Sequence, residues 1–167
     1  WACSNDPPGD EHALAGGGKA CVPPVTSLVR GLSLFEHSSD YSWEWAGSAQ
    51  HYSFYWHPEE RAVVTICLCK QANVAFSYVT ISSRSCDGKI YRTSNFPFSP
   101  TLKNTPTVSW NQIACRHCSL EQSLEHHKRF IKKKGGSLDN LMMPDPDILN
   151  KQVENDMRDQ IGHNIDS

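Results

Sequence analysis

Apolar and polar residues alternate through the middle of the chain, and turn-forming residues interrupt the alternation at regular intervals. A period of two over runs of this length, rich in aromatic and β-branched residues, indicates β-strands. Asp87-Gly88 is a strong two-residue hairpin signal. The pattern predicts an antiparallel meander of about four strands over residues 50–94. The predicted strands are His51–His57, Ala62–Cys69, Val74–Cys86 and Lys89–Ser94.

Both faces of this predicted sheet are apolar. Alternate side chains of a strand point to opposite faces. One face would carry the aliphatic residues Val64, Ile66, Leu68, Ala75, Val79 and Ile81. The other face would carry Tyr52, Phe54, Trp56, Val63, Cys67, Phe76 and Tyr78. A sheet of this kind is either covered on both sides or presents one side to a partner, and the pattern leaves both alternatives open.

Helical spacing replaces the alternation after residue 118. Ser119 and Gln122 have the spacing of a capping box and Gly135-Gly136 provides a stop, which predicts a helix over about 119–134. Asp145 and Pro146 have the character of a helix start, and an apolar stripe then runs to Gly162, which predicts a second helix over about 146–161. We expect the two helices to cover one sheet face through Leu120, Leu124, Ile131, Leu149, Val153 and Met157.

The chain length and punctuation predict one α+β domain with an arm. A chain of 167 residues corresponds to a single domain. Residues 1–30 are rich in Pro and Gly and have little to bury, so we expect an irregular arm there and a single globular domain over 31–167. The longest apolar runs fall far short of the ~20 residues of a membrane span, which excludes such a span.

Charge and cysteine content bear on compartment and partners. A net charge of −2 argues against a domain-scale surface for nucleic acid. The chain starts at Trp1 and holds seven cysteines, of which Cys3 and Cys21 flank the arm as a natural disulfide staple. We therefore expect an extracellular or secretory-pathway protein. The alternative is an intracellular protein in which Cys115-x-x-Cys118 is half of a zinc clamp or a redox pair.

The aromatic sheet face leads to the first functional hypothesis. Aromatic side chains with a polar tip are typical of ligand and partner surfaces. The sequence thus predicts a non-enzymatic binding domain for a protein or a small apolar ligand, with no cofactor. The expected binding residues are Trp43, Trp45, Tyr52, Phe54, Trp56, Phe76 and Tyr78.

A catalytic alternative comes from the segment that starts with the Cys115 motif. It continues with Leu124-Glu125-His126-His127-Lys128 and with Gly135-Gly136, which leads to Asn140. This order resembles the core of HNH nucleases, a branch of the ββα-metal family. In that family a cysteine knuckle precedes a strand with the catalytic histidine, and a Gly-Gly loop leads to an asparagine. The alternative is therefore a metal-dependent endonuclease that acts on nucleic acid.

The resemblance implies a role for each matching residue. His127 would be the general base, Asn140 would orient its ring, and His126 and Asn150 would bind the divalent metal. The family requires a strand at both histidines, whereas the capping box and leucine spacing predict a helix, and these expectations are incompatible. A third hypothesis is a zinc-stabilised adaptor that uses Cys115 and Cys118 with one or more of Cys67, Cys69 or Cys86.

Overall fold

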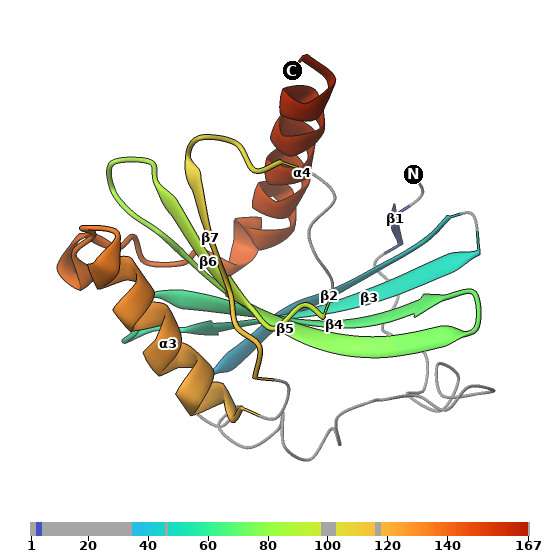
Figure 1. The fold of residues 1–167 in the computed structure, drawn as a ribbon, viewed down its shortest axis with the longest axis horizontal. Coiled ribbons are helices and arrows are strands. Elements are labelled where there is room, and N and C mark those ends of the chain that lie inside the picture. Colours follow the sequence, from blue (N-terminus) through green and yellow to red (C-terminus); the bar gives the residue numbers. More distant parts are fainter. Residues whose placement is uncertain (1–2, 5–34, 46, 98–102, 116–117, 167) are drawn as a thin grey trace.

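The computed structural model describes residues 3–4, 35–45, 47–97, 103–115 and 118–166 (Figure 1). Most of the predicted N-terminal arm and the expected Cys3–Cys21 staple lie outside these residues. Cys3–Ser4 forms a short strand, β1, that pairs with Trp43 and Ser42.

The described strands form one sheet in the order β1-β2-β3-β4-β5-β6-β7. Strands β2 to β6 are an antiparallel meander, and β7 adds to β6 in parallel. The strands after β1 are Glu36–Trp45 (β2), Ser48–His57 (β3), Ala62–Gln71 (β4), Val74–Arg84 (β5), Ile90–Ser94 (β6) and Val108–Gln112 (β7). The structure confirms the α+β class and the predicted meander, and it adds β1, β2 and β7, which the sequence pattern did not predict.

Helix α3, Leu120–Lys133, covers the aliphatic face of the sheet. Its capping box is formed, because Ser119 Oγ accepts from Gln122 N while Gln122 Oε1 accepts from Ser119 N. Gly135, at φ 78°, ends the helix in the left-handed region that favours glycine. Buried Leu120 packs with a cluster of aliphatic and aromatic side chains, comprising Phe35, Ala62, Val64, Val79 and Ile81.

Helix α4, Leu149–Asp166, covers the opposite, aromatic face (Figure 1). It follows a 3₁₀ turn, Pro146–Ile148, for which Asp145 is the N-cap as predicted. Leu149 and Val153 pack against Tyr41 and Phe54. The expectation that both helices share one face is wrong, because each apolar face needs its own cover. The predicted end at Gly162 is also wrong, since the helix continues to Asp166.

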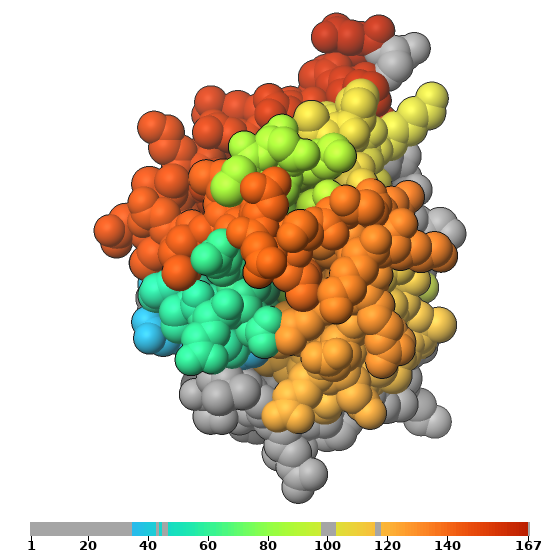
Figure 2. All heavy atoms as spheres, turned by 90° about the vertical axis from the view of Figure 1, so that its left-hand side faces the viewer, coloured from blue at the N-terminus to red at the C-terminus, as the bar shows by residue number. Residues whose placement is uncertain are grey.

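The segment between the helices lies at one end of the sheet and connects α3 to α4. It contains a second 3₁₀ turn, Leu138–Asn140, and lies against the β3–β4 and β5–β6 turns (Figure 2). Arg61 donates to the carbonyl of Leu141 at 2.8 Å. Gly136 lies so close to the sheet that an added Cβ would be 2.7 Å from the hydroxyl oxygen of Tyr91. Position 136 therefore has little room for a larger side chain.

Candidate functional site

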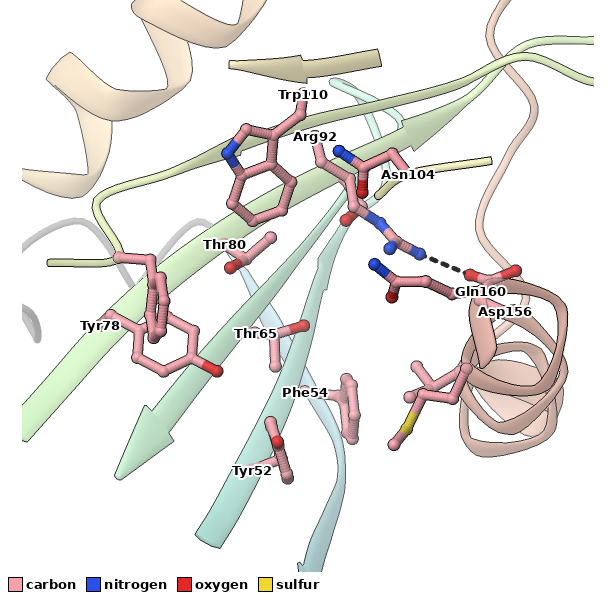
Figure 3. A pocket seen from close by; sticks show the side chains of 14 residues that line it. Tyr52, Phe54, Thr65, Tyr78, Thr80, Arg92, Asn104, Trp110, Asp156 and Gln160 are labelled. Carbon is pink, nitrogen blue, oxygen red and sulfur yellow. Dashed lines mark hydrogen bonds and ion pairs between the residues drawn. The ribbon is translucent and has the colours of Figure 1, made fainter. Parts of the chain in front are cut away.

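A cavity of about 390 Å³ lies between α4 and the aromatic face of the sheet (Figure 3). Helix α4 provides one wall with Val153, Asp156, Met157 and Gln160. The facing wall is aromatic, and its residues come from strands β3 to β7 and from the segment after β6. Its aromatic side chains are Tyr52, Phe54, Tyr78, Phe96 and Trp110.

The strand register explains why a cavity exists here. Thr65 of β4 pairs with Phe54 on one side and with Thr80 on the other. In the neighbouring row Ser82 of β5 pairs with Arg92 of β6. Short hydroxyl side chains therefore occupy the middle of the sheet opposite α4, while larger aromatic side chains surround them. The helix rests on the large side chains and a space remains above the small ones.

Arg92 and Asp156 form the polar end of the cavity, and Arg84 shares the carboxylate of Asp156 with Arg92. The Nη2 atoms of Arg84 and Arg92 both lie 2.6 Å from the same oxygen, Oδ2 of Asp156. The side chains of Arg92 and Asp156 are only 21% and 13% exposed. Burial lowers the pKa of Arg92 below its ordinary value; the charge of Asp156 opposes this shift and that of Arg84 adds to it. This ion pair also ties α4 to strands β5 and β6.

A second cavity of about 250 Å³ adjoins the first, and Arg92 and Asp156 line both of them. Arg84 and Arg61 line only the second one, together with Met142 and Met143, which are half exposed. Three arginines and two aspartates line this cavity, so its charged side chains carry one positive charge in excess. Asp156 and the two arginines that pair with it therefore lie between the first cavity, which has an aromatic wall, and the second cavity, whose charged side chains are mainly basic.

Next to the aromatic wall lies a buried thiol. Burial raises the pKa of Cys67 to about 12, although hydrogen bonds with Tyr78 and Tyr52 act in the opposite direction. Burial also raises the pKa of Tyr78. The thiol is therefore protonated at neutral pH, which makes it a poor nucleophile. Cys67 and Tyr78 supply packing and hydrogen bonding to this wall.

The structure brings three of the seven predicted binding residues into the cavity. Tyr52, Phe54 and Tyr78 line it. Phe76 stacks on Tyr78 with 6.2 Å between ring centroids, and half-buried Trp56 lies farther along the same face. The side chains of Trp43 and Trp45 lie outside the described part of the molecule.

Sequence reasoning missed the polar cavity residues. Asp156 and Gln160 are spaced four residues apart on α4, which places them on one side of the helix with Val153 and Met157. That spacing is the signal that could have found them. Arg92, Asn104 and Trp110 gave no comparable signal, because they reach the cavity through β6–β7 pairing and the segment before β7.

The residues of the nuclease alternative are dispersed. His126 and His127 lie on helix α3, so the strand that this resemblance requires is absent there. His127 is 1% exposed and bonds to Ser83 and Thr93. Asn140 lies in the 3₁₀ turn after α3. Asn150 lies on α4, where its Oδ1 accepts from Ser39.

The structure pairs two cysteines of the adaptor alternative and leaves the other three as thiols. Cys115 and Cys118 form a disulfide with 5.5 Å between their Cα atoms. Cys67 and Cys69 are buried free thiols, and Cys86 is exposed. Across the described ranges, no three His, Cys, Asp or Glu side chains are grouped in a way that could hold a metal ion.

Within the described residues, no helix combines the length and apolar character needed to cross a membrane. No protein-family model, no curated protein and no solved structure matches this chain. The candidate site therefore rests on the geometry of the cavity and of the ion pair at its end.

Proposed function

We propose that this protein is a non-enzymatic binding domain that holds a small, largely apolar ligand between α4 and the aromatic face of its sheet. The cavity of about 390 Å³ carries the proposal. Small-molecule sites have volumes of roughly 300–1,000 Å³, and they combine apolar walls with a few polar groups that orient the ligand. The aromatic wall and the Arg92–Asp156 end supply these two components.

The cover provided by α4 favours a small molecule over a protein partner. Phe54 is 1% exposed, and it packs against Leu149 of α4. A protein surface could reach this part of the aromatic face only if α4 left it. A small ligand fits under the helix. Trp110 adds its indole ring to the aromatic wall of this space.

We further propose a secretory-pathway location. The Cys115–Cys118 disulfide supports it, because such bonds persist mainly in oxidising compartments. Reduced and non-reduced intact masses of protein purified from its native source would test it. A mass difference of two hydrogens or more supports the proposal, and identical masses contradict it.

Filling the cavity tests the binding function. Thr65 lines the cavity, and its side chain makes no hydrogen bond to another described residue, so Thr65→Phe places a ring inside. Met157→Trp fills it from the opposite wall, which covers the case in which the first variant fails to fold. Val74→Phe is the matched control, since Val74 is 55% exposed and does not line the cavity.

The probe is the neutral two-ring alcohol naphthalen-2-ylmethanol, titrated by isothermal calorimetry. We expect saturable one-to-one binding to the wild type and to Val74→Phe, and a loss of at least tenfold in affinity in each folded cavity-filling variant. Absence of binding to the wild type, or equal binding by the filled variants, would overturn the proposal.

A further inference from the structure

The ion pair at the end of the cavity has more cationic groups than anionic ones. Arg84 and Arg92 approach the same oxygen of Asp156, and no other side chain among the described residues bonds to either guanidinium. A guanidinium carries five N–H donors in a planar fork, so most donors of both arginines are left over. Two cationic side chains share one carboxylate in a half-buried position.

Of the two arginines, Arg92 lines the proposed ligand cavity and brings its positive charge there. Its side chain lines the 390 Å³ cavity together with Asn104 and Gln160, which carry further amide donors. Figure 3 shows these three residues and Asp156 at one side of the pocket, and Tyr52 and Tyr78 at the other. A ligand lying across the cavity would thus meet apolar rings at one end and N–H donors at the other.

From this arrangement we infer that the ligand is a small carboxylic acid with an apolar, ring-sized body, and that Arg92 binds its carboxylate. This inference rests on the proposed binding function and names its ligand class. Asp156 remains the partner of Arg84, and the carboxylate of the ligand becomes a partner of Arg92. The carboxylate already present shows which anion these two guanidiniums accommodate.

The position of the pair makes the recognition selective. Charge-assisted hydrogen bonds are stronger in a partly buried position than in bulk water, and an arginine left with unused donors gains most from a second acceptor. A neutral ligand of the same shape gains only the apolar contacts. The carboxylate should therefore bind roughly tenfold more tightly than the matching alcohol, since a hydrogen bond to a charged group is worth about one decade or more of affinity.

The test compares two probes with the same ring. Naphthalene-2-carboxylate is ionised at pH 7, whereas naphthalen-2-ylmethanol is neutral, and both are titrated into the wild type, Arg92→Gln and Arg129→Gln. Arg129 is exposed on α3, so Arg129→Gln makes the same change in net charge away from the cavity. Arg84→Gln replaces Arg92→Gln if the latter fails to fold, because the Arg84 side chain is more exposed, at 31%. In Arg84→Gln the carboxylate of Asp156 pairs with Arg92 alone, so the cationic excess is gone and the preference for the carboxylate probe should be lost.

We expect the wild type and Arg129→Gln to prefer the carboxylate by about tenfold, and Arg92→Gln to bind both probes equally. Binding of the alcohol without preference for the carboxylate overturns this inference and leaves the binding function intact. A preference that survives in Arg92→Gln, or in Arg84→Gln where that variant stands in, also overturns it. If neither probe binds the wild type, the binding function itself fails.

Discussion

The buried histidine of α3 makes fold stability depend on pH. His127 lies in the core, where its Nδ1 is 2.9 Å from Thr93 Oγ1 and its Nε2 is 3.0 Å from Ser83 Oγ. Two hydroxyls satisfy both nitrogens of a neutral ring, because each hydroxyl can donate or accept. No carboxylate bonds to the ring among the described residues. Burial therefore disfavours the imidazolium and lowers the pKa of His127 from 6.5 to about 4.

The size and sign of the effect follow from proton linkage. Well above pH 6.5 the ring is neutral in both the folded and the unfolded state and adds no pH dependence. Below pH 6.5 the unfolded chain binds a proton that the folded chain does not, so stability falls until the pH reaches about 4. One pKa unit corresponds to about 1.36 kcal/mol, so the shift amounts to about 3 kcal/mol of lost folding free energy. That is a large share of the ~5–15 kcal/mol of an ordinary domain.

Urea unfolding between pH 7 and pH 4 measures this loss. His127→Gln removes the titrating ring but keeps a group able to donate and accept, so its stability should fall about 3 kcal/mol less over this range than that of the wild type. His126→Gln, a neighbouring exposed position, is the control and should follow the wild type. Parallel curves for the wild type and His127→Gln would refute the argument, as would a His126→Gln curve that matches His127→Gln.

Three further substitutions test the packing through the midpoint of urea unfolding at pH 7. Ser119→Ala removes the cap of α3 and should cost about 1 kcal/mol. Gly136→Ala forces a methyl group against Tyr91 and should cost about 1–3 kcal/mol. An unchanged midpoint would mean that the Tyr91 side chain moves aside without cost. Leu149→Ala leaves a void beside Phe54 and should cost about 2–5 kcal/mol; a cost under 1 kcal/mol would indicate that α4 is not firmly seated.

Local chemistry is what made the meander and α3 predictable. The capping box, the glycine stop and the Asp87-Gly88 turn act within a few residues, so the sequence carries them whatever the rest of the chain does. Strand β2 lacks such a signal, because its residues are mainly polar and a bulge between His37 and Ser39 disturbs its alternation. Strand β7 has five residues and pairs in parallel with β6, and that contact is set by the fold.

The periodicity of the sequence could not predict which sheet face α4 covers. An apolar stripe indicates that a helix has a buried side, but a sheet with two apolar faces offers two places for that side to pack. The apolar stripe also gave no indication that Asp156 faces the sheet. Asp156 lies there as the partner of Arg84 from β5 and Arg92 from β6. The residue Ile161 has the spacing of this apolar stripe, yet it is 37% exposed. The side of α4 that faces the sheet therefore depends on long-range ion pairs as well as on its apolar residues.

The pleat of strands β4 and β5 separates the two tasks of the sheet. Val64, Val79 and Ile81 point to the α3 side and fill its core. Their chain neighbours Thr65, Thr80 and Ser82 point to the α4 side and leave the cavity open. Successive positions on one strand thus have different roles. Shortening an aliphatic side chain removes packing and lowers stability. Enlarging a hydroxyl side chain fills a space that the folded chain leaves empty. Under the proposed function, selection on ligand binding acts on the hydroxyl positions while selection on folding acts on the aliphatic ones, although the two kinds of position are adjacent in the chain.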